Sequence, residues 1–222
     1  MTPSHRLHAL KQNPASHQVS SANQRTYDRI APLYDFLDGV YEYSWKRRLR
    51  EELFRHARGR LLDVGIGTGC NMPFYPQGSE VVGIDMSERM LDRAHARAHE
   101  LGRHVTLRPM NLLSLDFPDA SFDTVTVTFV LLCLPEDLQI LALRELRRVT
   151  RPGGRILLLD YRLSDQLALR LWHRCLSPWM KWAFAGRFDT ATERYLTVAG
   201  LNAVEHRTFM GEGVVMLVLE PT

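Results

Sequence analysis

The sequence predicts an α/β protein whose mostly parallel, seven-stranded sheet is covered by helices on both faces. Short apolar or β-branched runs alternate with runs of helical period between residues 60 and 161. Strands separated by helices pair as parallel neighbours through crossover connections. Two late runs, residues 202–210 and 213–221, have no helical run between them. We expect these two runs to pair as an antiparallel hairpin that ends the sheet.

The N-terminal region divides into two parts. Residues 1–24 are rich in Ser, Asn, Gln, His and Pro and have no periodicity, a composition typical of a mobile arm. From residue 25 to residue 58, apolar and aromatic residues recur at helical spacing, and Gly39 and Gly59 interrupt the run. This pattern predicts two helices before the first strand. We assign residues 25–222 to a single domain, because the composition does not change along them.

The central elements alternate in a regular order. The parallel strands are expected at residues 60–67, 80–85, 105–110, 122–130 and 155–161. Helices are expected at residues 87–102 and 135–150, and the second of them leads through the turn "RPGG" into the fifth strand. Two further helical patterns, at residues 164–186 and 190–200, precede the final hairpin.

The composition excludes several classes of protein. The chain has 222 residues, 45% of them hydrophobic and 24% charged, which is ordinary for one globular domain. The formal charge is only +3, and residues 1–60 hold eleven Lys or Arg against six Asp or Glu. The three cysteines show no metal-ligand spacing, so we expect a reducing compartment and no metal site. Since no apolar run is long enough to span a bilayer, we expect a soluble or peripheral protein.

An apolar run leads directly into a glycine-rich segment, "LLDVGIGTGCN". Gly65, Gly67 and Gly69 follow the first expected strand, a pattern in which the strand turns tightly and its backbone N–H groups approach a ligand. The spacing differs from GxGxxG, and the segment lacks the GK[ST] of a phosphate-binding P-loop. A tight turn without a ligand is the alternative.

The second expected strand ends in an acid. Asp85 closes "VVGID", and a carboxylate at that strand tip can accept hydrogen bonds from both hydroxyls of a ribose. Asp85 could instead cap the helix that follows, although Ser87 supplies an equally good N-cap. The glycine loop and the acid together favour a ligand that contains ribose.

Four segments resemble the successive motifs of class I AdoMet-dependent methyltransferases: "LLDVGIGTG", "VVGIDMSERML", "FDTVTVTFVLLCLP" and "LRELRRVTRPGGRILLLD". The resemblance implies the Rossmann-like fold of that family, with residues 59–160 as the AdoMet-binding core. Residues 25–58 would be helices over the site, and residues 161–222 would form the substrate-side helices and the final strands. AdoMet is then the cofactor, and S-adenosyl-L-homocysteine is the product.

The resemblance also implies roles for individual residues. The loop from Gly65 to Gly69 would face the methionine part of AdoMet, Asp85 the ribose, and Met86 one face of the adenine. Asp63 would anchor the loop or the amino group of the cofactor. The full set of implied cofactor-binding residues is Asp63, Gly65, Gly67, Thr68, Gly69, Asp85, Met86, Asn111, Leu112 and Val130.

Two positions depart from the family pattern. Where the family commonly has an acid that contacts the adenine amino group, this sequence offers Asn111, whose carbonyl oxygen can accept from the same N–H. Pro73 and Pro76 stand where many members have a full helix, so we expect that helix to be short or broken. The fourth strand leads into "TFVLLCLP", without a DPPY, NPPY or Pro-Cys motif. This argues against N6 methylation of nucleic-acid bases and against C5 methylation of cytosine.

The N-terminal segment "YDRIAPLYD" resembles bacterial phospholipid N-methyltransferases and, less closely, ubiquinone/menaquinone C-methyltransferases. The first resemblance implies stepwise methylation of phosphatidylethanolamine head groups toward phosphatidylcholine. The catalytic candidates are Tyr27, Tyr34 and Tyr161. A tyrosine face suits an amine that becomes permanently cationic, and Tyr34, Asp35 or Tyr161 could take its proton. Simple packing of the N-terminal tyrosines against the sheet is the alternative.

A lipid substrate also needs a partner for its phosphodiester and a membrane-facing surface. Arg162 and Arg187 are candidates for the phosphodiester by their positions near strand ends. The basic run over residues 46–60 and the Trp-rich segment 171–184 are candidates for contact with an anionic membrane. A solvated, ion-paired face and core packing are the respective alternatives. The helical pattern of the Trp-rich segment puts Trp172, Cys175, Leu176 and Trp179 on one side, with a break expected at Ser177–Pro178.

The leading hypothesis is therefore a phospholipid N-methyltransferase, cytoplasmic and peripheral at the inner membrane surface. A quinone-precursor C-methyltransferase and a non-catalytic AdoMet-binding interaction subunit are the alternatives. No nucleic-acid partner is expected, because the net charge is small and no recognisable nucleic-acid-binding module is present.

Overall fold

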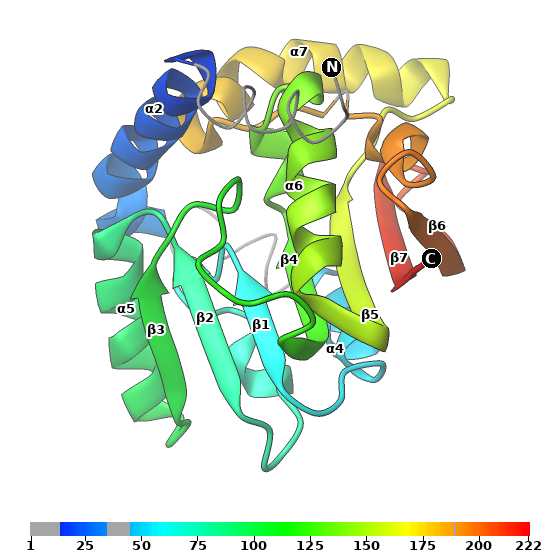
Figure 1. The fold of residues 1–222 in the computed structure, drawn as a ribbon. Coiled ribbons are helices and arrows are strands. Elements are labelled where there is room, and N and C mark those ends of the chain that lie inside the picture. The colour runs from blue at the N-terminus through cyan, green and yellow to red at the C-terminus, as the bar shows by residue number, and fades with distance from the viewer. Residues whose placement is uncertain (1–13, 35–44, 189) are drawn as a thin grey trace.

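A computed structural model describes residues 14–34, 45–188 and 190–222, without the side chains of residues 14–17, 168, 172, 179, 183 and 184. Its centre is a seven-stranded sheet in the order β3-β2-β1-β4-β5-β7-β6 (Figure 1). The strands are β1 Leu61–Val64, β2 Val81–Asp85, β3 Val105–Pro109, β4 Phe122–Thr128, β5 Thr150–Tyr161, β6 Leu201–Phe209 and β7 Val214–Pro221. Strands β1 to β5 pair in parallel, while β7 runs antiparallel to β5 and to β6. The predicted fold class and the final hairpin are confirmed.

Helices cover both faces and the upper end of this sheet (Figure 1). The α-helices are α2 Pro14–Ile30, α4 Arg47–Phe54, α5 Glu88–Glu100, α6 Glu136–Val149 and α7 Leu167–Phe184. Short 3-10 turns are η1 Ala31–Leu33, η3 Met72–Phe74, η4 Leu131–Cys133 and η5 Thr192–Tyr195. The single turn at η3 confirms that the prolines around it prevent a full helix.

The burial of each strand explains whether its sequence is apolar or polar. All four residues of β1 are buried, as are the first six of β7, because both strands have a neighbour on each side within the sheet and both faces of the sheet are covered. The edge strand β6 is mostly exposed and carries polar residues. Packing of the apolar central strands against α6 forms the main core, with Phe122 and Leu62 among its fully buried members. Helix α5 packs in a separate cluster with Leu61, Ile66 and Val81.

Three local expectations are corrected by the structure. Residues 14–24, expected to belong to a mobile arm, lie in helix α2, while residues 1–13 are outside the described residues. The run over residues 190–200 forms only the short turn η5 rather than a helix. The "RPGG" segment lies within β5 as an irregularity in its pairing with β4, where Phe122 pairs with Thr150 and Thr124 with Arg155.

Helix α7 differs from expectation in two ways. It runs unbroken through Pro178, which is exposed together with Arg174 one turn earlier, so water can satisfy the carbonyl that loses its hydrogen bond. Its inward stripe contains Leu176 and the buried Met180, whereas Cys175, expected on the same side as Leu176, is exposed. The side chains of Trp172 and Trp179 lie outside the described residues.

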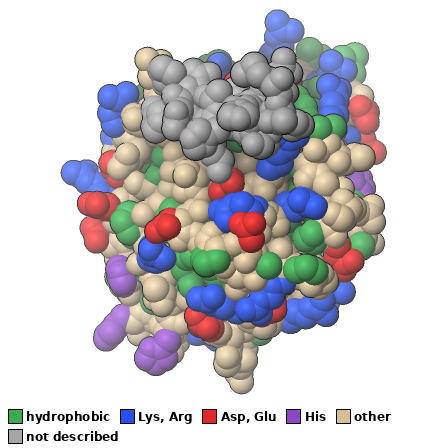
Figure 2. Space-filling view, viewed as in Figure 1, with side chains coloured by type: hydrophobic (Ala, Val, Ile, Leu, Met, Phe, Trp, Pro, Cys, Tyr) green, Lys and Arg blue, Asp and Glu red, His purple; other side chains and the backbone are tan. Residues whose placement is uncertain are grey.

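The surface on the side drawn in Figure 2 mixes charges of both signs, with Lys and Arg side chains beside Asp and Glu side chains. Ion pairs of the protein include Arg148–Asp119, Arg151–Asp123 and Arg60–Glu80. In the basic run over residues 46–60, Lys46 and Arg50 are buried, and Arg55 is paired with Glu51. Only part of that run is therefore available to a membrane surface.

Candidate active site

A cavity opens at the carboxyl ends of the central strands, beneath α2. The space that the cavity spans, including the part open to solvent, is about 970 Å³. Strand ends and their loops supply Gly65, Gly67, Thr68, Asp85, Met86, Asn111, Leu112 and Val130, and the N-terminal elements supply Ser20, Asn23, Tyr27, Tyr34 and Arg50. Ligands of open α/β sheets bind at this edge.

The glycine loop after β1 has the backbone that the sequence pattern predicts. Gly65, Gly67 and Gly69 all have positive φ angles, of 67°, 55° and 86°, which non-glycine residues rarely adopt. Gly65 has a second reason to be glycine, since a Cβ atom there would lie 2.4 Å from a methyl carbon of Val130. The loop can therefore bring its backbone against a ligand only while Gly65 has no side chain.

Asp85 joins the glycine loop to the start of α5. Its Oδ2 atom accepts a hydrogen bond from the Gly67 N–H, and its Oδ1 atom accepts one from the Ser87 N–H, both at 2.9 Å. Ser87 itself caps α5 by accepting from the Met90 N–H. Each carboxylate oxygen has capacity for another donor, so Asp85 can organise the loop and still receive the two hydroxyls of a ribose. Burial raises the pKa of Asp85 to about 6.

Asp63 lies beneath the loop and does not line the cavity. It is fully buried and accepts hydrogen bonds from Asn71 Nδ2 at 2.9 Å, from Thr126 Oγ1 at 2.6 Å and from Tyr75 Oη at 2.5 Å. Burial raises the pKa of Asp63, and these hydrogen bonds oppose the rise. Of the two roles that the sequence left open, this geometry favours anchoring of the loop.

Arg50 is a site residue that the sequence analysis did not find. It is buried, it lines the cavity, and its guanidinium group donates to Asn71 Oδ1 at 2.5 Å and to Thr128 Oγ1 at 2.8 Å. In the sequence it is one of several basic residues of α4, and only contacts with distant residues distinguish it. It gives the cavity a buried cation, which suits an anionic group such as a carboxylate.

Helix α2 forms the roof of the cavity. Asn111 Nδ2 donates to Ser20 Oγ at 3.0 Å, and Asn23 Nδ2 donates to the Cys133 carbonyl at 2.9 Å. Tyr27 Oη is hydrogen-bonded to Cys133 Sγ at 3.0 Å. Burial raises the pKa of Tyr27 well above its usual value and that of Cys133 to about 12, so both groups stay neutral at neutral pH. Helix α2 is thus held over the cavity largely through polar side chains. Because its sequence is polar, its composition resembles that of a mobile arm.

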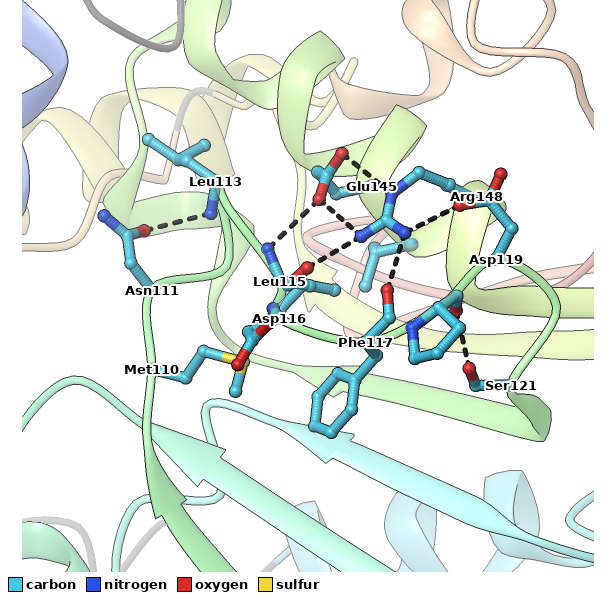
Figure 3. Close-up of polar contacts among 12 residues, drawn as sticks. Met110, Asn111, Leu113, Leu115, Asp116, Phe117, Asp119, Ser121, Glu145 and Arg148 are labelled. Atoms are coloured by element: carbon cyan, nitrogen blue, oxygen red, sulfur yellow. Dashed lines mark hydrogen bonds and ion pairs between the residues drawn. The ribbon is translucent and has the colours of Figure 1, made fainter.

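Asn111 begins the loop after β3, which a partly buried ion pair holds in place (Figure 3). Asn111 Oδ1 accepts from the Leu113 N–H at 2.9 Å. Further along, Glu145 Oε2 accepts from the Leu115 N–H at 3.1 Å, and Arg148 donates to the Leu115 carbonyl at 2.8 Å while pairing with Glu145. The Asn111 oxygen thus already accepts one backbone donor, which leaves it one further lone pair for an adenine amino group.

Five of the predicted site residues do not line the cavity. Asp63 is beneath the loop, Gly69 packs toward Met72, and Tyr161 belongs to an aromatic cluster with Trp45, Phe129 and Phe188. Arg162 pairs with Glu193 at 3.0 Å, and the Arg187 N–H donates to the Leu132 carbonyl. Asp35, the third proposed base, is outside the described residues.

A second buried acid stands behind the cavity wall. Asp160, at the end of β5, accepts hydrogen bonds from the N–H groups of Leu132 and Tyr161. Burial raises its pKa to about 7, and the nearby Lys46 opposes the rise. Lys46 Nζ lies 4.7 Å from the ring centre of Phe129, which lines the cavity. Asp160 therefore fixes the segment after β4 without facing the ligand space itself.

Two kinds of feature are absent from residues 14–34, 45–188 and 190–222. No group of three or more His, Cys, Asp or Glu side chains there is arranged to hold a metal ion. No helix in the same ranges combines the length and the apolar character needed to cross a bilayer.

Comparison with known proteins agrees with the geometry of the cavity. A family model described as a methyltransferase domain matches residues 62–158. The phosphatidylethanolamine N-methyltransferase of Cereibacter sphaeroides is 35% identical over 83% of this chain and 89% of that protein. The chain belongs to the class I AdoMet-dependent methyltransferases. Its cofactor is AdoMet, and the glycine loop, Asp85 and Arg50 are suited to the backbone, ribose and carboxylate contacts that this cofactor needs.

Another relative is named for a substrate that differs from that of the Cereibacter sphaeroides enzyme. The demethylmenaquinone methyltransferase of Thermus thermophilus is 32% identical over 77% of this chain and 80% of that protein. A solved SAM-dependent methyltransferase from Methanosarcina mazei superimposes with a TM-score of 0.64 at 18% identity, covering 77% of this chain and 96% of that one. At that identity the likeness shows the fold alone, so the substrate has to be argued from the site.

Proposed function

We propose that this methyltransferase methylates the amine of phosphatidylethanolamine stepwise toward phosphatidylcholine, at the cytoplasmic face of a membrane. The observation that carries the proposal is the aromatic lining of the cavity. Tyr27, Tyr34 and Phe129 lie in its wall, and the two tyrosine rings are 6.4 Å apart. Aromatic faces attract ammonium groups, including permanently cationic ones. The similarity to the Cereibacter sphaeroides enzyme supports the same substrate class.

The cofactor contacts that we propose follow from the cavity lining. The backbone from Gly65 to Thr68 lies against the methionine part of AdoMet, and Asp85 accepts hydrogen bonds from its ribose. Met86, Asn111, Leu112 and Val130 surround the adenine side. AdoMet supplies an electrophilic methyl group whose leaving group is a neutral thioether, so the protein mainly aligns the amine and excludes water.

The attacking amine must first lose its proton. Tyr27 is a poor base, since its raised pKa keeps it protonated. Tyr34 lines the cavity, whereas Tyr161 does not, so we propose that Tyr34 contacts the amine directly or through water. Arg162 is already bound by Glu193, which makes it a weaker candidate for the phosphodiester than its position in the sequence suggests.

The affinity for AdoMet should depend on pH through Asp85. Below about pH 6 the protonated Asp85 loses one acceptor site, so we expect affinity to fall as pH decreases from about 7 to 5, by up to about tenfold per unit. Calorimetric titration across this range measures the effect. Asp160→Asn is the control, because it removes the other carboxyl that titrates nearby, with a pKa of about 7, and should leave the transition in place. A flat profile in the wild type would contradict the role of Asp85.

The stability of the unliganded protein should show the opposite trend. The pKa of Asp85 is about 6 in the folded state, above its ordinary value of 3.8. Between these two values the folded state binds more protons than the unfolded state, so the contribution of Asp85 to stability falls as pH rises through the window.

The substrate is tested by incubating the protein with methyl-labelled AdoMet and two kinds of vesicle. One contains phosphatidylethanolamine, and the other contains a demethylmenaquinone in phosphatidylglycerol, which has no amine. We expect label in mono-, di- or trimethylated head groups and none in the quinone. Label in the quinone alone would replace the proposal by its rival, the C-methyltransferase suggested by the Thermus thermophilus relative.

A further inference from the structure

A second groove lies outside the cofactor cavity and shares none of its lining residues. It runs along α7 and is lined by Leu163, Leu167, Arg170, Leu171, His173, Arg174, Ser177 and Phe188. Helices α7 and α2 lie at the same end of the sheet, above the carboxyl ends of the strands (Figure 1). The groove is thus on the end of the molecule where the cofactor cavity is found.

The groove is positively charged, and its charges are not neutralised locally. Helix α7 carries Arg170, Arg174 and Lys181 and contains no acidic residue. Arg170 and Arg174 lie one turn apart on one face, an arrangement that costs stability by like-charge repulsion. Within the described parts of the chain neither has an ion-pair partner, in contrast to Arg162 with Glu193 and to the mixed charges of Figure 2. An anion in the groove would relieve this repulsion.

The rim of the groove is apolar. Leu167 is 69% exposed and Leu171 is 55% exposed, although both sit beside the two arginines on α7. Near the end of the helix, Trp182 is 64% exposed. Exposed leucine and tryptophan interspersed with Arg and Lys is the composition of a helix that lies in a membrane interface.

Two further contacts hold the side chains of the groove and helix α7 in place. His173 stacks on Phe188 with ring centres 4.5 Å apart. Burial lowers the pKa of His173, and its buried Nδ1 atom has no hydrogen-bond partner among the described residues. Arg29 of α2 donates to the Trp182 carbonyl at 2.8 Å and lies over the Trp182 ring. This contact joins the groove-bearing helix to the roof of the cavity.

We propose that the α7 groove docks the protein on a bilayer by binding the phosphate group of an anionic phospholipid. Arg170, Arg174 and the Ser177 hydroxyl contact the phosphate, while Leu167, Leu171 and Trp182 enter the interface. The docked lipid is separate from the substrate in the cavity. The proposal deepens the proposed function, because a membrane-resident amine would then meet the end of the molecule where the cavity lies.

The test is sedimentation of the full chain with vesicles of equimolar phosphatidylethanolamine and phosphatidylglycerol. Replacing both groove arginines, Arg170→Ser with Arg174→Ser, should weaken binding about 30-fold, the effect expected for two basic groups at an anionic surface. The matched control is Arg47→Ser with Arg48→Ser, which removes the same charge from exposed residues of α4. Circular dichroism melts establish that both variants are folded.

Two outcomes would overturn the proposal: unchanged binding of the α7 variant, or an equal or larger loss in the α4 control. A separate readout distinguishes docking from catalysis. In detergent micelles, where no bilayer is present, the α7 variant should methylate phosphatidylethanolamine at the wild-type rate. If the wild type shows no such activity, the proposed function is wrong. The vesicle sedimentation still tests whether the α7 groove binds an anionic bilayer.

Discussion

Replacing Asp85 with alanine should abolish AdoMet binding and leave the fold intact. In the proposed complex the carboxylate accepts hydrogen bonds from both ribose hydroxyls, and hydrogen bonds to a charged group contribute about 1.5–3 kcal/mol each. Losing two of them weakens binding by more than about 100-fold. The Gly67 and Ser87 N–H groups also lose their acceptor, so the empty loop should become less ordered. Isothermal titration calorimetry with AdoMet measures the effect.

The matched control for this variant is Asp92→Ala. Asp92 is an exposed acid of α5, close in sequence to Asp85. Its replacement removes the same charge without touching the cavity and should leave the affinity unchanged. An Asp85→Ala protein that melts like the wild type and binds AdoMet as tightly would remove Asp85 from the site.

Replacing Gly65 with alanine should damage both the loop and the cofactor site. The φ angle of 67° is strained for alanine by about 1–2 kcal/mol. The new methyl group would also lie 2.4 Å from a Val130 methyl carbon, so either Val130 or the loop must move. Since both line the cavity, AdoMet affinity should fall by at least about tenfold in addition to the loss of stability.

Gly78→Ala separates these two effects. Gly78 has a φ angle of 75°, but open space surrounds its Cβ position, and it lies outside the cavity. This variant should lose stability from backbone strain alone and bind AdoMet like the wild type. Equal cofactor affinities for the two variants, both measured by calorimetry below their melting temperatures, would show that the Gly65–Val130 contact does not shape the site.

What the sequence predicts well is local in the chain. The glycine loop, Asp85 and the alternation of strands with helices are encoded within short segments, because backbone conformation and burial pattern leave a direct trace there. The role of Arg50 cannot be predicted from its local sequence. Its role comes from contacts with Asn71 and Thr128, which are 21 and 78 residues away. The first part of helix α2, residues 14–24, was missed for the same reason, since its stabilising bonds run to Asn111 and Cys133.

For helix α7, the sequence predicts the helix but not which of its faces is buried. Its apolar residues are spread around the helix, so the pattern defines an amphipathic helix without fixing which stripe faces inward. The structure turns Leu176 and Met180 inward and leaves Cys175, Leu171 and Trp182 exposed. Only the packing against α2 and Phe188 selects that orientation, and it is this selection that exposes the groove.

The central claim is that the cavity aligns a lipid amine with the methyl group of AdoMet. The most direct test is mass spectrometry of phosphatidylethanolamine vesicles after incubation with the protein and AdoMet carrying a deuterated methyl group. We expect one to three labelled methyl groups, all located in the head-group fragment of the lipid. Unlabelled head groups in a protein that binds AdoMet would contradict it.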